Sequence, residues 1–285
     1  MNKQKAAALS IFSNTALIFF KVIVGVLMGS VSVISEAIHS SIDLLASLIA
    51  FVSIKIASKA EDDGHPFGHG KYENVSGFVE AILILLAAAL IIFQAIKRIF
   101  EGGTVDNVGA GILVMLLAAV VNFFISMILL KTAKKTDSIA LEADGMHLLT
   151  DVYTSIGVFL GLVLLKITNI PIIDPLTAIF VALLIIKTSI DLIKKSLNDL
   201  VDSKLPDDDI LKILNILDSH QEITKYHDLK TRKSGPSREI NVNLHVVENT
   251  SLVDAHNLSD KVEEEIKDIF PGGSYVLIHI EPENS

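Results

Sequence analysis

Six long apolar stretches dominate the sequence and limit the folds that are open to it. They cover about residues 6–29, 31–57, 75–98, 108–131, 138–166 and 172–195. A membrane-crossing helix needs roughly 20 predominantly apolar residues, and each stretch is long enough. The chain is 51% hydrophobic, with a mean hydropathy of +0.54, which is too apolar for an ordinary soluble domain. The sequence therefore predicts an α-helical membrane protein with a bundle of six transmembrane helices.

The basic residues between these stretches predict their orientation. Most lysines near the ends of the stretches fall on one side of the predicted membrane: Lys3, Lys5, Lys55, Lys59, Lys71, Lys131, Lys134, Lys135, Lys194 and Lys195. The other side has Lys97, Arg98 and Lys166. Because cytoplasmic loops carry the excess of lysine and arginine, both termini are expected in the cytoplasm. The apolar run after the basic N-terminus is longer than a signal-peptide core, which favours a retained first span.

A change of composition marks a second domain after the last apolar stretch. Pro206 and the three aspartates that follow it favour the start of a new helix, so we expect domains at 1–205 and 206–285. The second domain is expected to contain a helix at 206–219, strands near 223–232 and 239–246, a helix at about 252–269, and a last strand. This order fits a small cytoplasmic α/β domain of ferredoxin type.

Charge narrows the possible partners of the second domain. The chain has 24 basic and 33 acidic residues, a net charge of −9. Residues 206–285 carry 16 acidic and 8 basic side chains, so most of that charge lies there. An acidic surface argues against nucleic acid as a partner and is compatible with collecting cations.

Two His-x-x-x-Asp motifs lie inside apolar stretches. His39 and Asp43 occur in the second stretch, and His147 and Asp151 in the fifth. Residues four apart share one face of a helix, and a carboxylate at membrane depth costs roughly 2.5–3.5 kcal/mol on insertion scales. One such motif is equally well explained by a polar contact between helices. Two copies favour a shared function.

The donor set of the two motifs suits a metal ion. Two imidazoles and two carboxylates match the ligands of tetrahedral zinc. The chain has no cysteine, so any metal site must use histidine, carboxylate or carbonyl groups. The second and fifth spans run in opposite directions, and each histidine lies a similar distance in from its own face. The four side chains are therefore expected to meet near the middle of the bilayer.

Other polar residues lie in or between the spans. Glu80 and Lys21 are within apolar stretches, and an acidic residue, Glu36 or Asp144, precedes each motif histidine by three positions. Glu80 either lines a cytoplasmic entrance or makes a snorkelling or interhelical contact. Lys21 either snorkels or lines a cavity.

The loop at residues 61–73 combines metal-ligating side chains with helix breakers. Asp62, Asp63, His65 and His69 fall within eight residues, and Gly64, Pro66, Gly68 and Gly70 disfavour a regular helix. The loop resembles a metal clip, although a solvated polar loop explains the same residues.

The tail is rich in histidine. It holds five of the nine in the chain: His220, His227, His245, His256 and His279. Single surface histidines are common, but five on a small acidic domain favour metal binding. His279 and Glu281, two apart on one strand face, form the sharpest pair.

The chain as a whole resembles the cation diffusion facilitator family. The resemblance lies in KVIVGVLMGSVSVISEAIHSSIDLL, DDGHPFGHGKYE and SIALEADGMHLLTDVYTSIGVFLG, and extends to HDLKTRKSGP and FPGGSYVLIHIE. It implies six membrane helices, a cytoplasmic ferredoxin-like domain, a homodimer and antiport of divalent metal ions against protons. It also implies a multi-pass protein of the bacterial inner membrane. The implied transported and regulatory ion is Zn²⁺, with Cd²⁺, Co²⁺ and Fe²⁺ as alternatives.

The resemblance also assigns residues to sites. The transport site would be His39, Asp43, His147 and Asp151. The loop site would be Asp62, His65 and His69, and the tail site His227, His256, His279 and Glu281. The tail departs from the family pattern, because Asn243 stands where a metal-binding histidine is frequent. His245, on the same strand face, is the candidate substitute.

The alternatives to a transporter are an intramembrane metalloenzyme and a channel or metal-sensing receptor. An intramembrane metalloenzyme is disfavoured because the chain has no HExxH motif, and no catalytic residues are predicted. A channel or a metal-sensing receptor is the other class, although a channel is expected to have weak, multiple sites rather than a closed set of four ligands.

Overall fold

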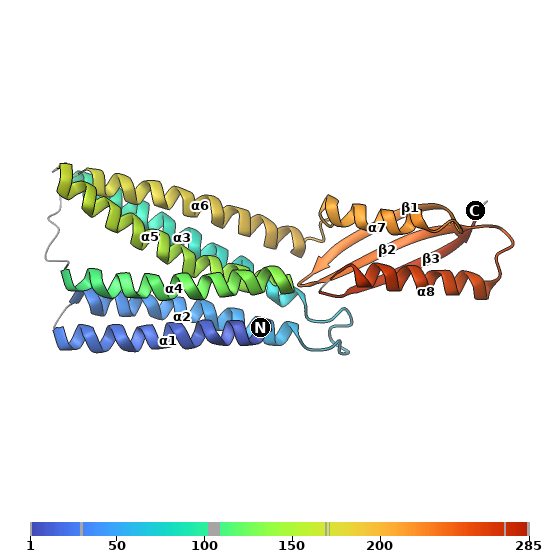
Figure 1. Cartoon of the computed structure of the whole chain (residues 1–285), viewed down its shortest axis with the longest axis horizontal. Coiled ribbons are helices and arrows are strands. Elements are labelled where there is room, and N and C mark those ends of the chain that lie inside the picture. Colours follow the sequence, from blue (N-terminus) through green and yellow to red (C-terminus); the bar gives the residue numbers. More distant parts are fainter. Residues whose placement is uncertain are drawn as a thin grey trace. The chain divides into compact units, whose positions relative to one another are not determined.

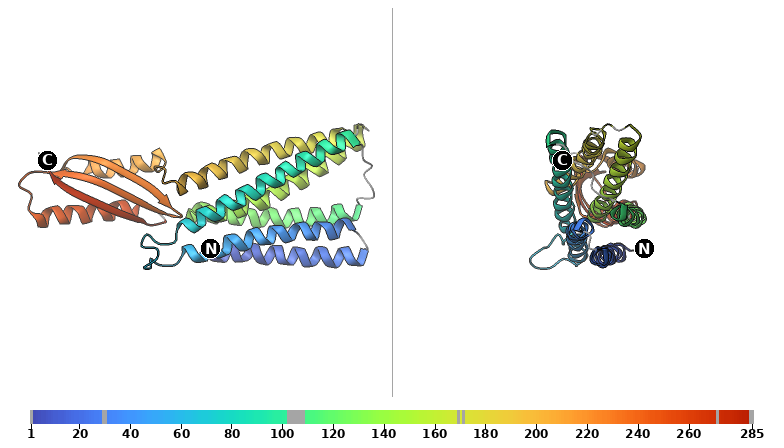
Figure 2. Two further views of the ribbon diagram at one scale, coloured as in Figure 1. Left: turned by 180° about the vertical axis from the view of Figure 1, so that it is seen from behind. Right: turned by 90° about the vertical axis from the view of Figure 1, so that its left-hand side faces the viewer.

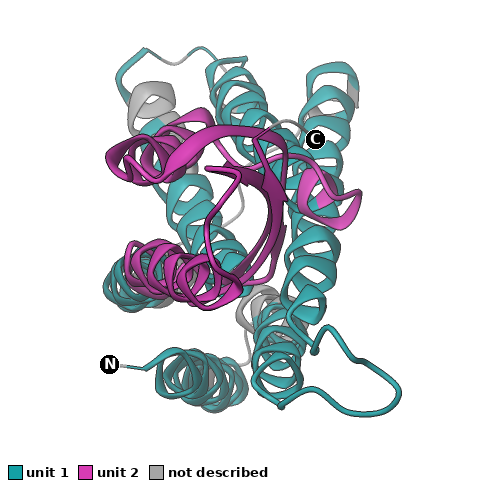
Figure 3. Cartoon of the chain, turned by 90° about the vertical axis from the view of Figure 1, so that its right-hand side faces the viewer, with its two compact units in different colours: residues 1–134, 138–196 teal, residues 135–137, 197–285 magenta. Residues whose placement is uncertain are grey.

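The computed structural model describes residues 2–28, 31–101, 109–168, 170, 172–270 and 272–283. The chain forms two compact units (Figure 3). Unit 1 consists of Met1–Lys134 and Ser138–Ser196, and unit 2 consists of Lys135–Asp137 and Leu197–Ser285. The link between the fourth and fifth helices is thus grouped with the tail, a feature that the sequence did not indicate.

Unit 1 is built from long helices at each of the six predicted positions (Figure 1). They are α1 Lys3–Met28, α2 Val31–Ala57, α3 Lys71–Glu101, α4 Gly109–Thr136, α5 Ile139–Thr168 and α6 Ile173–Leu200. Among the described residues, four segments are long and apolar enough to cross a membrane: Lys3–Leu27, Lys71–Lys97, Leu116–Thr136 and Pro175–Leu200. The presence of six helices agrees with the sequence, whereas six crossings stay a prediction.

The helices of unit 1 pack through small residues. Helix α1 lies along α2, α3 lies along α5, and α2 also contacts α3 and α5 (Figure 2). Alanines at positions 6, 133 and 140, from α1, α4 and α5, are buried in one apolar cluster. Gly145 of α5 allows α4 to come close, since a Cβ atom there would lie 3.0 Å from Leu130 Cγ. Small interfacial residues are typical of packed membrane helices, and many large apolar side chains point outward.

Unit 2 contains a three-stranded sheet and two helices, in the predicted order. The elements are α7 Asp207–Ser219, β1 Ile223–Ser234, β2 Ser237–Val246, α8 Leu252–Asp268 and β3 Ser274–Pro282. Strand β2 is central, antiparallel to β1 and parallel to β3. Gly235 takes φ 59° in the two-residue loop between β1 and β2, and Ser251 caps α8 by accepting a hydrogen bond from Asp254 N.

The core of unit 2 lies on one face of the sheet. The predicted inward residues of β2, which are Ile240, Val242, Leu244 and Val246, are buried together with residues of both helices, including Leu217 and Val262. Because alternate residues of a strand point to opposite faces, both helices cover the same face. The polar residues of β2 and β3 lie together on the other face of the sheet.

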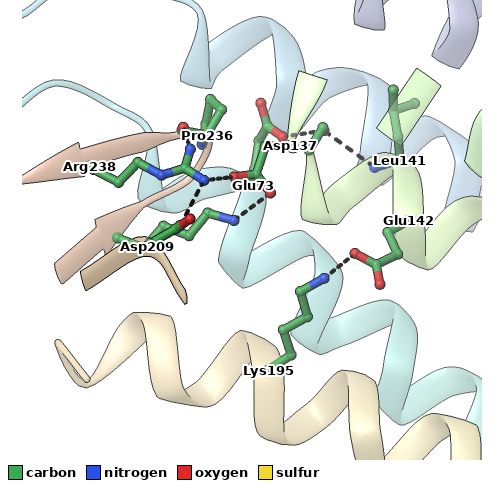
Figure 4. Close-up of polar contacts among 10 residues, drawn as sticks. Glu73, Asp137, Leu141, Glu142, Lys195, Asp209, Pro236 and Arg238 are labelled. Atoms are coloured by element: carbon green, nitrogen blue, oxygen red, sulfur yellow. Dashed lines mark hydrogen bonds and ion pairs between the residues drawn. The ribbon is translucent and has the colours of Figure 1, made fainter. Parts of the chain in front are cut away.

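Asp137 is ion-paired within unit 2. Its carboxylate lies 2.7 Å from Lys233 Nζ and 2.6 Å from Arg238 Nη2. Arg238 also donates to the carbonyl of Pro236 and lies 3.4 Å from Asp209 (Figure 4). Burial alone would raise the pKa of Asp137, but the positive charge of Lys233 and then of Arg238 outweighs burial and lowers it. Asp137 is therefore ionised at neutral pH.

Candidate metal-transport site

A carboxylate–histidine cluster forms where α2 meets α5. Asp43 of α2 and His147 and Asp151 of α5 each offer a ligand atom, and these atoms lie within 4.8 Å of one another. His147 Nε2 is 3.1 Å from Asp43 Oδ1, and both side chains are buried. Leu148, next to His147, fills the neighbouring apolar cluster and so helps to fix the rotation of α5.

Three of the four predicted transport ligands are therefore close together. The fourth, His39, belongs to α2, but its side chain lies outside the described residues. Asn122 of α4 adds a contact that the sequence did not specify, because its amide donates to Asp151 Oδ2 at 3.5 Å. His147 Nδ1 is buried and makes no hydrogen bond within the described chain. The arrangement offers one nitrogen and two carboxylate ligands to a divalent cation.

A second cluster forms in the loop before α3. Asp62, His65 and His69 form a group of possible ligands, with Asp62 oxygens 3.3 Å from His65 Nδ1 and 3.3 Å from His69 Nε2. The backbone N–H of His65 donates to the Asp62 carboxylate at 2.8 Å and is the largest cause that lowers the pKa of Asp62. The carboxylate is thus ionised and ready to bind a cation. Asp63 is not part of the group.

A third cluster lies on the polar face of the sheet. His227 of β1, His245 of β2 and Glu281 of β3 form a group of possible ligands. Glu281 Oε2 lies 3.2 Å from His227 Nε2 and 3.4 Å from His245 Nε2. The strand pairing explains this, because His245 pairs with Glu281 on one side and with Lys225, two residues before His227, on the other. Each strand supplies one ligand.

The hydrogen bond of His245 indicates that this cluster fits a cation. Its Nδ1 lies 3.1 Å from the carbonyl oxygen of Pro282, which can only accept, so Nδ1 carries the hydrogen. In a neutral imidazole, Nε2 is then a bare acceptor, and it is buried beside the acceptor oxygens of Glu281. Two acceptors face each other, and a metal ion between them would satisfy both.

The charge of Glu281 favours the same interpretation. The hydrogen bond with His227 is the largest cause that lowers its pKa, followed by the charges of His227, His245 and His279. Glu281 is therefore a carboxylate over the whole range in which histidine is neutral. The ionised carboxylate that metal binding requires is therefore present at neutral pH.

The remaining tail residues lie in different places. His256 is 70% exposed on α8 and lies 3.4 Å from Asp260, so it is not brought to the cluster. His279 shares the face of Glu281, with Nε2 3.5 Å from Oε1, but it is 68% exposed and outside the group. Asn243 donates to Glu281 Oε1 at 3.5 Å. His220 lies 3.1 Å from Glu265 instead.

Comparison with known proteins places this arrangement in a family. Residues 7–201 match the cation efflux transmembrane domain, and residues 205–283 match the cytoplasmic domain of cation efflux proteins. The chain belongs to the cation efflux family. This cation efflux protein is 31% identical over 277 residues to an uncharacterized transporter of Synechocystis. The match covers 97% of this chain and 89% of that transporter. It is 30% identical over 278 residues to the cation-efflux pump FieF of Escherichia fergusonii, and the match covers 98% of this chain and 92% of FieF.

Two solved structures are also similar to the cation efflux protein. One is a structure of CzrB: the match has 34% identity, covers 28% of this chain and 98% of that chain, and has a TM-score of 0.27. The other is the metal-bound C-terminal domain of the CzcD transporter from Thermotoga maritima. This match has 25% identity, covers 27% of this chain and 91% of that chain, and has a TM-score of 0.26. The family shows that the protein is a multi-pass membrane transporter of metal cations with a metal-binding cytoplasmic domain.

Proposed function

We propose that this protein exports zinc from the cytoplasm in exchange for protons, by alternating access. The observation that carries the proposal is the convergence of Asp43, His147 and Asp151 between two buried helix faces. Charged groups in membrane helices are expensive and mark ion pathways. One imidazole and two carboxylates, with His39 proposed as the fourth ligand, suit zinc better than a hard cation that prefers oxygen alone.

The same ligands supply the coupling to protons. Histidine must be neutral and carboxylates ionised to hold the metal, so binding releases protons and protonation releases the metal. Histidine is poised for this exchange near neutral pH. Zinc would load from the cytoplasm as protons leave the ligands. Protons would then reload the ligands from the outer side, and the helices would rock about the fixed site.

The proposed architecture follows from the same reasoning. Residues 1–205 form the transport domain, with six spans and both termini in the cytoplasm. Residues 206–285 form a ferredoxin-type cytoplasmic domain that pairs two copies of the chain and holds regulatory zinc. The match of residues 205–283 to the cytoplasmic domain of cation efflux proteins supports this role. The loop cluster of Asp62, His65 and His69 is proposed to bind a further zinc ion.

The decisive experiment is zinc flux in proteoliposomes with an imposed pH gradient. Asp151→Ala removes one carboxylate ligand and is expected to lower the flux by at least an order of magnitude, while the protein still folds. Glu142→Gln is the matched control, because Glu142 is a carboxylate on the same helix that pairs with Lys195 (Figure 4). Normal flux from Asp151→Ala would exclude the site.

The same assay separates a channel from an antiporter. An antiporter accumulates zinc against its gradient when a pH gradient is present, whereas a channel only dissipates the zinc gradient. Accumulation that persists when the pH gradient is collapsed would contradict proton coupling.

A further inference from the structure

A second polar contact joins α2 and α5 one helical turn away from the metal ligands. Ser47 of α2 donates a hydrogen bond to Asp144 Oδ1 of α5 at 2.8 Å. Ser47 lies four residues after Asp43 on α2, and Asp144 lies three residues before His147 on α5. Both spacings put the residue on the same helix face as the ligand. The two helices are therefore joined at two neighbouring levels, by the ligand pair and by the Ser47–Asp144 pair.

Helix α1 holds the Ser47 hydroxyl in place. Asn14 Nδ2 donates to Ser47 Oγ at 2.8 Å, and Ser10 Oγ lies 2.9 Å from it. With its hydrogen donated to Asp144 and two contacts to α1, the hydroxyl has its full set of partners. Ser10, Ser47 and Asp144 are 0% exposed, and Asn14 is 3% exposed. Because these side chains are shielded from water, the hydroxyl has few other partners, and the bond to Asp144 stays directed.

Asp144 is buried in a membrane helix without belonging to the ligand cluster. The group of possible ligands at this site consists of Asp43, His147 and Asp151. A carboxyl group inside a membrane helix is costly, so its presence at position 144 requires a physical explanation. The hydrogen bond with Ser47 offers one, since it ties the helix that carries His147 and Asp151 to the helix that carries Asp43.

The two contacts between α2 and α5 differ in what happens to them when metal binds. The contact of 3.1 Å between His147 Nε2 and Asp43 Oδ1 joins two ligand atoms. A metal ion needs both of these atoms, so their mutual hydrogen bond is lost on binding. The Ser47–Asp144 hydrogen bond uses no ligand atom and can persist. It is therefore the contact that can keep the two helices in the same rotation with and without metal.

We propose that Ser47 and Asp144 are positioning residues, whose hydrogen bond sets the rotation of α2 against α5 and so the preference of the site for zinc. The proposal rests on the zinc transport function argued above. Zinc takes four ligands in a tetrahedron, with bonds of about 2.0–2.2 Å to nitrogen and oxygen, so a small rotation of one helix disrupts the set. Mn²⁺ prefers an octahedral shell of oxygen ligands that water can complete, so it tolerates the same rotation better.

Metal competition in proteoliposomes tests the effect on zinc preference. Ser47→Ala removes the donor and Asp144→Leu removes the acceptor, and each is expected to raise the KM for zinc about tenfold. The inhibition constant of Mn²⁺ against zinc flux should change much less. Asp144→Asn keeps an oxygen that can accept from Ser47, so its KM for zinc is expected near the wild-type value. Ser41→Ala is the matched control, since Ser41 donates to the carbonyl of Ala37 in its own helix.

Three results of this assay would overturn the proposal. The first is an unchanged KM for zinc in Ser47→Ala. The second is a KM for zinc that rises no more than the inhibition constant of Mn²⁺, because a general loss of stability affects both metals alike. The third is a KM for zinc as high in Asp144→Asn as in Asp144→Leu, because the charge of Asp144 would then matter and its hydrogen bond would not.

The visible spectrum of bound Co²⁺ tests the ligand geometry without transport. Co²⁺ absorbs far more strongly in a tetrahedral ligand set than in an octahedral one. In the purified full chain, the part of the absorption that Asp151→Ala removes belongs to the transport site. Ser47→Ala is expected to remove most of that same part, and Ser41→Ala none of it. An absorption that Ser47→Ala leaves unchanged, or no absorption that depends on Asp151, would overturn the positioning role.

The two measurements separate this proposal from the transport function on which it rests. If the wild type moved no zinc, the proposed transport function would fail, and the Co²⁺ spectrum would still decide the role of Ser47. If Asp144→Leu did not fold, the comparison of Ser47→Ala with Asp144→Asn would carry the decision in both measurements.

Discussion

At the scale of single residues, the hydrogen bond from His245 to Pro282 determines the chemistry of the tail cluster. It fixes which imidazole nitrogen is free, and it aims that nitrogen at Glu281. The sequence indicated His245 as a substitute for a missing family ligand, because it lies on the same strand face as Asn243. It could not indicate that His256 would lie on the exposed surface of α8, since that depends on how the helix docks on the sheet.

Acidification is expected to release zinc from the tail cluster through its histidines. Glu281 has a lowered pKa, so it stays ionised until the pH falls below its ordinary value of 4.5. A histidine must be neutral to bind a metal ion, so protons compete with zinc at His227 and His245 as the pH falls. Zinc affinity should therefore fall steadily on acidification. Calorimetric titration of the full chain with zinc measures this pH dependence. The difference in zinc affinity between wild type and His245→Ala isolates the contribution of the tail cluster.

His256→Ala provides the control for this titration, because His256 is outside the cluster and should leave the pH profile unchanged. A zinc affinity that does not fall as the solution is acidified would contradict ligation by these two histidines.

At the scale of elements, hydrophobic length predicted the helices well, because a span of about 20 apolar residues has few other folds available to it. Contacts between helices were less predictable. The HxxxD spacing indicated that His147 and Asp151 share a face, and antiparallel spans brought Asp43 to them. The hydrogen bond from Ser47 of α2 to Asp144 of α5 depends on the rotation of α2 against α5, which no spacing within one helix reveals. For the same reason, the contact of Asn122 with Asp151 was missed.

A glycine on α5 gives a test of this packing. A Cβ atom at Gly157 would lie 2.6 Å from Val181 Cγ2 of α6, too close for an ordinary contact. Gly157→Ala is expected to cost about 1–3 kcal/mol, as overpacking usually does, and to lower the Tm by several degrees. The double variant with Val181→Ala should recover most of this loss. Thermal unfolding in detergent checks both, and a double variant no more stable than the single one would place the clash elsewhere.

At the scale of the whole molecule, composition changes from an apolar part to an acidic one, and the structure has two compact units, the second of which takes in Leu197–Ser285. Composition did not predict that Lys135–Asp137 would group with the tail. That grouping depends on ion pairs of Asp137 with Lys233 and Arg238, which lie far from it in the sequence. Pairings between distant charges have no periodicity by which they could be recognised.

The tail is expected to hold two copies of the chain together. Light scattering in detergent should give a dimer for the full chain and mainly monomer for a chain that ends after Val201. The physical reason is that truncation removes the domain matched by the cytoplasmic dimer family, residues 205–283. Glu142→Gln should remain dimeric. A truncated chain that stays dimeric over the same dilution range would locate the dimer contact in the membrane helices.

The three ligands of the tail cluster come from three different strands, and this has a consequence for folding. Sliding any strand by one residue would turn its ligand to the opposite side of the sheet, among the apolar side chains. A zinc ion bound there would therefore hold all three strands in a single alignment, and misaligned sheets would lose the ion. Bound zinc would therefore stabilise the correctly aligned sheet relative to every misaligned one.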